Sequence, residues 1–567
     1  MRQDDGQGLR LTVLALVLIA IVAPIAAGLA KTAFVAFGHL PAIGANGPGL
    51  APFQQLLAMP GFATSLWLTL FTGFGSTVLA LVAAIGTVAS LEARGRSSLR
   101  LITPILAAPH AAVAIGLAFL LAPSGWIARL LSPWATGWQV PADLAIVHDP
   151  YGLALLAGLV VKELPFLVLV LLVAMRQLPV AQNIAEGRAL GYGRGQVWAR
   201  VILPQLYPLI RLPVLAVLIF ALSVVDMAII LGPSNPPTLA VAVTRWLNAP
   251  DLALLLPGTA GAVALALLSA VAAALWLLAE RLVAHFGRIW IGRGHRGMAG
   301  SPLNRLAFGL GAGFLLTGLL SLVVLLLWSL AWRWSFPNAW PESWTMRFWQ
   351  SPDMGWGPAL WQSLSIGLCA TILSLSLAIL WLEAEDRGHL GRARWAEGLV
   401  YLPLMVPQVA FLFGLQVVFL TVGLRSGYAP VVWAHCLFVF PYVMIALSDP
   451  WRALDPRLVQ TAAALGAGPW RRLYAVKLPC LLGPVAGAAS IGFAVSVAQF
   501  LPTLFLGAGR ITTLTTEAVA LSSGADRRLT GVFGVLQTIL PLMAYWLALA
   551  LPATAFRHRR ALRGGAS

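Results

Sequence analysis

The chain is dominated by apolar runs that are each long enough to cross a lipid bilayer. A membrane-spanning helix needs about 20 predominantly apolar residues, and 59% of the residues here are hydrophobic while only 10% are charged. Soluble domains carry roughly 25% charged residues. The sequence therefore predicts an all-α polytopic membrane protein with about twelve transmembrane helices, at approximately 11–30, 64–90, 101–122, 152–175, 207–231, 258–283, 306–330, 361–382, 397–422, 431–448, 483–506 and 531–554.

Arginine and lysine residues indicate the orientation of these helices. They gather at both chain ends and in alternate loops, including those around Arg188 and Arg471, whereas the other loops hold few. Basic residues mark the cytoplasmic side of membrane proteins. We therefore expect a multi-pass protein of the bacterial inner membrane with both termini in the cytoplasm. The net charge of +17 does not indicate nucleic-acid binding, because the basic residues are scattered through short loops.

Two polar loops on the predicted cytoplasmic side repeat one another. In each, a segment of small residues ends at a glycine, Gly191 or Gly466, and nine further residues lead to a four-residue segment that ends in Leu-Pro, at Pro204 or Pro479. Glycine is the usual residue after the last turn of a helix. The loops therefore predict two equivalent short helices that face the same aqueous compartment.

The repeat extends into the flanking apolar runs and predicts two halves. Each loop is preceded by four expected helices and followed by two, so the halves would be parallel repeats of six helices, related by an axis near the membrane normal. We expect a first permease half at 1–290, with its core at about 62–283, and a second half at 291–567, with its core at about 360–555.

The two loops resemble the EAA signature of the transmembrane subunits of ATP-binding-cassette (ABC) importers: Glu-Ala-Ala, three residues, glycine, nine residues and Ile-x-Leu-Pro. The whole organisation resembles the fused two-half permeases of the ferric-iron and thiamine import type, with the type I importer fold. The resemblance implies that each loop docks in a groove of a separate ATPase subunit. The residues expected to dock are Glu186, Gly191, Leu203 and Pro204 in the first loop and Gln460, Gly466, Leu478 and Pro479 in the second.

The chain departs from this signature at its glutamate. Ala185 and Gln460 stand where the family has glutamate, and Glu186 lies one residue later. One residue on a helix is a rotation of about 100°. If that carboxylate forms an ion pair with the ATPase in the family, the pair is absent or redirected here.

The resemblance also implies the partners. They are two copies of an ATPase, a periplasmic solute-binding protein that delivers iron, thiamine or another small solute, and the surrounding membrane lipid. A phosphate-binding loop needs GxxxxGK[ST], and none of the three lysines, Lys31, Lys162 and Lys477, follows a glycine. We therefore expect ATP and Mg²⁺ to bind the partner, and this chain to have no cofactor, no metal and no catalytic residue.

Polar residues inside apolar runs are candidates for the translocation pathway, because a charge in lipid is costly and normally faces protein or water. Asp226 and Gln499 occupy equivalent places in the two halves and are the candidate pathway residues. A structural hydrogen-bonding role is the alternative. Lys162 and Glu163 are adjacent in one run and cannot share a helix face, so each must find its own partner.

Two other classes of protein remain as alternatives. A twelve-span secondary transporter of the major-facilitator kind would explain Asp386-Arg387-Gly388, which resembles a loop motif of those carriers, but it does not explain the paired loops. A pore or a membrane enzyme would need a cluster of catalytic side chains, and the sequence has neither HExxH nor GxSxG. The three cysteines lie in or beside apolar runs and predict no disulfide.

Overall fold

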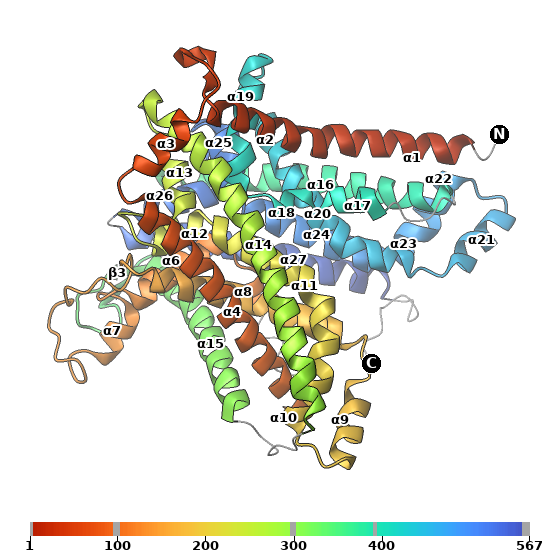
Figure 1. The fold of residues 1–567 in the computed structure, drawn as a ribbon, viewed down its shortest axis with the longest axis horizontal. Coiled ribbons are helices and arrows are strands. Elements are labelled where there is room, and N and C mark those ends of the chain that lie inside the picture. The colour runs from red at the N-terminus through yellow and green to blue at the C-terminus, as the bar shows by residue number, and fades with distance from the viewer. Residues whose placement is uncertain (1–3, 95–102, 295–301, 389–393, 525, 558–567) are drawn as a thin grey trace.

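A computed structural model describes residues 4–94, 103–294, 302–388, 394–524 and 526–557 (Figure 1). The strands in these ranges form two short antiparallel hairpins, β1 His39–Leu40 with β2 Ala45–Asn46 and β3 Ala331–Arg333 with β4 Ser343–Trp344. Among the described residues, ten helical segments are long and apolar enough to cross a membrane, and an eleventh is reached if the bent pair Pro469–Cys480 and Leu482–Val497 counts as one span. The all-α membrane fold is confirmed.

The helices follow the same order in both sequence halves. The first half contains α1 Asp4–Val17, the π-helical turn η1 Leu18–Val22, α2 Ala23–Ala36, η2 Pro41–Ile43, α3 Ala51–Ala58, α4 Phe62–Arg94, α5 Thr103–Ala107, α6 His110–Leu121, α7 Trp126–Leu131, α8 Leu153–Met175, α9 Val180–Ala189, α10 Arg194–Val197, η4 Trp198–Ile202, α11 Leu203–Ser223, α12 Asp226–Leu231, α13 Leu239–Leu247, η5 Leu252–Leu254 and α14 Leu255–Gly292.

The second half contains α15 Pro302–Leu330, η6 Pro352–Met354, α16 Trp356–Gly388, α17 Arg394–Val400, α18 Leu402–Met405, α19 Gln408–Thr421, α20 Tyr428–Arg452, α21 Pro456–Ala464, α22 Pro469–Arg472, η7 Leu473–Lys477, α23 Leu478–Cys480, α24 Leu482–Val497, α25 Leu501–Gly507, α26 Leu514–Ser522 and α27 Arg527–Ala555. The long helices α4 and α16, which hold equivalent places in the two halves, are each 33 residues long.

The expected single helix at 397–422 is wrong in detail. That run forms α17, α18 and α19, and α19 has only 14 residues. Pro403 lies in the first turn of α18 and Pro407 is the N-cap of α19. Proline lacks the N–H needed to continue a helix, so these residues start new helices. The described part of the run at 101–122 divides in the same way, with Pro109 preceding α6.

Two arms diverge from a shared region at the left of Figure 1. In one arm, α4, α11 and α14 run toward α9 and α10 at the bottom of the picture. In the other, α1 and α16 run toward α21 and α22 at the right. Described contacts between the arms include those of α6 with α26 and α27, and of α12 with α26. The arms are therefore joined near the breaks that precede α12 and α25, and the two repeated loops lie at their separate ends.

The first helix of each sequence half packs on the other half. α2 lies against α19 and α1 against α16, and a Cβ atom at Gly414 would collide with the backbone of Gly28. The Gly414 N–H donates to Thr32 Oγ1 at 3.1 Å, and Trp433 Nε1 donates to the carbonyl of Ala20 at 3.0 Å. Likewise α15, the first helix of the second half, packs on α4 and α6 of the first half as well as on α27 of its own half. The small residues allow these helices to approach closely, as in other membrane helix pairs.

Candidate functional site

The first repeated loop is a short helix with a glycine-terminated end. Gly191 follows α9 with a φ of 83°, a conformation that glycine adopts without steric cost. The N–H of Gly191 donates to Arg188 O at 3.0 Å, and the N–H of Tyr192 donates to Gly187 O at 3.0 Å. These two bonds form a Schellman motif, which satisfies the last carbonyls of the helix. The predicted role of Gly191 as a helix terminator is confirmed.

The second loop repeats this geometry. Gly466 follows α21 with a φ of 81°. Its N–H donates to Ala463 O at 3.0 Å, and the N–H of Ala467 donates to Ala462 O at 3.0 Å. The same two bonds therefore end both helices.

Each loop presents a large apolar side chain to solvent just before its glycine. Leu190 and Leu465 are the residues just before the two glycines, and they are 64% and 84% exposed. Glu186 and Gln460 are also exposed, and Glu186 Oε1 accepts a hydrogen bond from Gln182 Nε2 at 2.8 Å. Each loop therefore has an apolar tip beside a polar residue, which is a common composition for a docking surface.

The Leu-Pro residues lie behind the tips, where the chain turns into the spanning helices. Leu203 and Pro204 begin α11 after the π-helical turn η4, whereas Leu478 and Pro479 form α23 after η7. The first segment, Arg194–Ser223, is one continuous span, but the second is bent by 80° before α24. These prolines therefore start helices, as expected for the first helical turn, and they lie away from the exposed leucines in sequence.

Ion pairs at the end of α16 hold the second loop. Lys477 Nζ lies 2.7 Å from Glu383 Oε2 and 2.5 Å from Asp386 Oδ2. Arg387 Nε lies 2.7 Å from Glu383 Oε1, and its guanidinium is 4.3 Å from the Trp470 ring centroid. The side chains of Lys477 and Glu383 are only 6% and 3% exposed. This charged network fixes η7, and with it α21 and α22, to the arm.

Removal of the buried lysine should destabilise the second arm. Lys477→Met leaves the Glu383 and Asp386 carboxylates without their shared cation, and breaking a buried pair from one side costs about 3 kcal/mol. We expect a lower thermal unfolding midpoint for the detergent-solubilised subunit. Arg471→Met, which removes the same charge from an exposed residue nearby, is the control and should leave the midpoint within about 1 °C. Equal midpoints for the two variants would contradict a stabilising network.

Different contacts hold the first loop. Arg194 of α10 pairs with Glu92 at the end of α4. The Arg200 guanidinium lies 4.3 Å from the Trp290 ring centroid. Trp198 is 4% exposed, whereas its counterpart Trp470 is 47% exposed. The two loop tips are thus alike, although their attachments to the arms differ.

Sequence reasoning assigned Glu383 and Asp386 no part in the loops. Asp386-Arg387 instead favoured a carrier. The structure instead joins both carboxylates to the loop through Lys477. The available signal was the equivalence of Leu91-Glu92-Ala93 and Leu382-Glu383-Ala384, because Glu92 and Glu383 both pair with the loop that follows.

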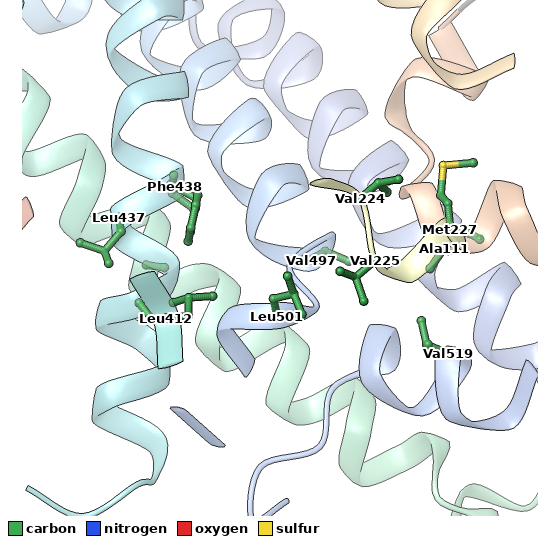
Figure 2. Packing of buried hydrophobic residues seen from close by; sticks show 14 of the residues in the cluster. Ala111, Val224, Val225, Met227, Leu412, Leu437, Phe438, Val497, Leu501 and Val519 are labelled. Atoms are coloured by element: carbon green, nitrogen blue, oxygen red, sulfur yellow. The ribbon is translucent and has the colours of Figure 1, made fainter. Parts of the chain in front are cut away.

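The second candidate site lies where two spanning helices are interrupted. α11 ends at Ser223 and α12 begins at Asp226, while α24 ends at Val497 and α25 begins at Leu501. We call the apolar side chains at these two breaks the seam: Val224, Val225, Met227, Val497 and Leu501. They are buried in one cluster, and Figure 2 shows Val225 and Val497 between the two broken helices.

The predicted pathway residues occupy equivalent positions beside the seam. Asp226 is the first residue of α12, and Gln499 lies between α24 and α25, 8% exposed. Both positions interrupt helical hydrogen bonding at membrane depth, which is tolerated only where protein or water replaces the lost partners. Their placement agrees with the repeat, and their part in transport stays a prediction.

Comparisons with known proteins agree with this architecture. Residues 392–558 match the family described as "Binding-protein-dependent transport system inner membrane component". The chain is 34% identical over 505 residues to the inner membrane ABC transporter permease protein YnjC of Escherichia coli, which covers 88% of this chain and 90% of that protein. It is 28% identical over 233 residues to the putative 2-aminoethylphosphonate transport system permease protein PhnV of Salmonella typhimurium (40% and 86%). It is 23% identical over 208 residues to a spermidine/putrescine transport system permease protein PotC homolog of Mycoplasma pneumoniae (36% and 72%).

Proposed function

Because the chain belongs to the family of binding-protein-dependent transport inner-membrane components, as the permease subunit of an ABC importer, we propose that α9 and α21 are its two docking surfaces for the ATPase. The observation that carries this proposal is their equivalence. Both helices end in the same Schellman motif, both expose the leucine before the glycine, and they lie at the ends of separate arms. Two copies of one ATPase would then bind two copies of one surface.

The diverging arms support an alternating-access mechanism. With α9 and α21 apart and the arms joined near the seam, this conformation is the one expected to be open toward the ATPase side. ATP binding would draw the two ATPase copies together, and the arms would follow as rigid bodies. The seam would then open toward the opposite side, where a periplasmic solute-binding protein delivers the substrate. In this scheme both termini lie on the ATPase side, in the cytoplasm.

The substrate is proposed to be a small polar solute. The iron and thiamine type suggested by the sequence stays one possibility among several. Two relatives are named for 2-aminoethylphosphonate and for spermidine/putrescine, all of which carry amino groups. A protonated amine passing the seam would be attracted by the carboxylate of Asp226, and we place Asp226 on the pathway for this reason. Gln499 is placed there because it holds the equivalent position in the second half.

No carrier mechanism is needed to explain the chain. Its relatives are ABC transporter permeases, and Asp386 and Arg387, which favoured a major-facilitator carrier, are members of the ion-pair network under the second loop. ATP hydrolysis belongs to the partner, and the chain itself acts as a non-catalytic transport subunit.

The docking assignment can be tested at the glycine that ends the second loop. A Cβ atom at Gly466 would meet nothing within 4 Å, so a substitution there changes the backbone and the docking surface rather than the internal packing. Asparagine tolerates a positive φ, whereas a β-branched residue does not. We expect Gly466→Val to reduce co-purification of the ATPase about tenfold, more strongly with Gly191→Val added, and Gly466→Asn to retain it. An intact complex in the double valine variant would exclude the docking role.

A further inference from the structure

A buried lysine closes the break between α5 and α6. Lys162 of α8 donates from Nζ to the carbonyl oxygens of Ile105 at 3.0 Å, Leu106 at 3.1 Å and Ala108 at 2.5 Å. These carbonyls lie at the end of α5, where Pro109 prevents the chain from continuing the helix. Unpaired carbonyls are costly in a membrane, and a cation is favoured at the carboxyl end of a helix. Lys162 therefore supplies the hydrogen bonds that the break removes.

The adjacent glutamate reaches the other side of the same break. Glu163 Oε1 lies 3.6 Å from Nε2 of His110, the first residue of α6. The same helix, α8, also packs on α12. Lys162 and Glu163 thus contact residues on both sides of the α5–α6 break, and α8 itself reaches the edge of the seam.

The helix that carries these residues leads directly to the first loop. α8 ends at Met175 and α9 begins at Val180. At the other side of the break, α6 packs on α12 and on α26 of the second arm. Ala111 of α6 and Met227 of α12 lie close together in Figure 2, beside the seam. A continuous series of contacts therefore connects α9 to the seam through α8, the α5–α6 break and α6.

The second arm lacks this arrangement. The repeat aligns Pro165-Phe166 with Pro441-Tyr442, which places Phe438 and Val439 where the first arm has Lys162 and Glu163. Phe438 and Val439 are 2% and 0% exposed within the apolar cluster. The equivalent break before α19 therefore has apolar side chains at the positions of the lysine and the glutamate.

We propose that Lys162 and Glu163 are positioning residues that transmit movement of the first docking loop to the seam. In the second arm the equivalent positions are apolar, so only the first arm transmits this movement through charged side chains. The proposal rests on the docking role proposed above for α9. When the ATPase moves α9, α8 moves with it as a rigid helix, and the Lys162 bonds carry the end of α5 along. Glu163 carries the start of α6 through His110, and α6 shifts α12 at the seam.

The test measures opening of the seam in the complete transporter and needs no substrate. In a background without Cys369, Cys436 and Cys480, Val225→Cys reports exposure of the seam to a charged, membrane-impermeant maleimide. The complex with its ATPase is reconstituted in proteoliposomes and labelled from the side opposite the ATPase, with and without ATP and orthovanadate. We expect the trapped state to raise the labelling rate about tenfold, and Lys162→Met to reduce that rise to about twofold or less. The amount of vanadate-trapped nucleotide should stay unchanged.

Three further variants separate coupling from stability. Lys162→Arg keeps a cation that can donate to the same carbonyls and should restore most of the rise. Glu163→Gln keeps the lysine bonds, so it should fold even if Lys162→Met does not, and should still reduce the rise. Phe438→Leu, at the equivalent position of the second arm, should leave it intact. A normal rise in both Lys162→Met and Glu163→Gln, or an equal loss in Phe438→Leu, would overturn the proposal. Failure of the docking assignment is read separately: it would leave ATPase co-purification intact in the double variant Gly191→Val with Gly466→Val, whatever the labelling rates of the Lys162 and Glu163 variants.

Discussion

A double substitution, Leu190→Asp with Leu465→Asp, is expected to abolish assembly with the ATPase. Both leucines are exposed at the tips of the repeated loops, so the change should not disturb the fold of the permease. In a docked complex each new carboxylate would be buried without a partner, which costs about 3 kcal/mol or more and lowers affinity by about 100-fold at each loop. Quantitative co-purification and ATP hydrolysis in membranes measure the effect.

The two single variants should have smaller effects than the double variant. Either substitution alone should leave one loop competent, so that the ATPase remains associated but hydrolysis by the complex falls. Leu144→Asp provides the control, because Leu144 is an exposed leucine outside both loops and should tolerate the change. Normal assembly of the double variant would show that the leucine tips are not contact points, whatever the remaining residues of the loops do.

Joining the two sides of the seam is expected to stop the transport cycle. In a background without native cysteines, Val225→Cys and Val497→Cys can be linked by a short bis-methanethiosulfonate, which forms a disulfide with each cysteine and releases methanesulfinate, because both valines lie between the broken helices (Figure 2). A linked seam cannot separate, and arms that move as rigid bodies cannot then bring α9 and α21 together. ATP hydrolysis by the complete complex should fall at least about tenfold and return when the link is reduced.

The single-cysteine variants treated with the same reagent control for modification without linkage. Both should hydrolyse ATP at the rate of the untreated complex. Full hydrolysis by a permease that mass spectrometry shows to be completely linked would mean that the seam does not need to open, and the alternating-access scheme would have to be replaced.

The sequence predicted the parts of the molecule that depend on local chemistry. Length and hydropathy identified the spanning helices, because a bilayer sets the length of an apolar helix. Glycine after a run of small residues identified the ends of α9 and α21, because a positive φ at Gly191 and Gly466 strongly favours glycine. The interruptions near Pro109 and Pro407 were not predicted, because each apolar run was expected to form a single helix, although proline removes a helical hydrogen bond.

Contacts between distant segments could not be predicted in this way. The sequence showed that Lys162 and Glu163 must point in different directions, but it did not show that the lysine binds the carbonyls of Ile105, Leu106 and Ala108. The pairing of Lys477 on η7 with Glu383 and Asp386 on α16 was also not predicted, because the repeated Leu-Glu-Ala segments show that Glu383 has a counterpart but not which residue it contacts. Such pairings depend on tertiary packing, and neither periodicity nor motif spacing contains them.

The packing of α2 against α19 and of α15 against α4 and α6 has a consequence for the assembly of the two halves after synthesis. If the two halves were separate polypeptides, each would be left with an uncovered flank until it met the other. In a single continuous chain, α2 and α15 are made together in equal amounts. Each can then pack on the opposite half of the same molecule, and the two halves always come from one matched pair.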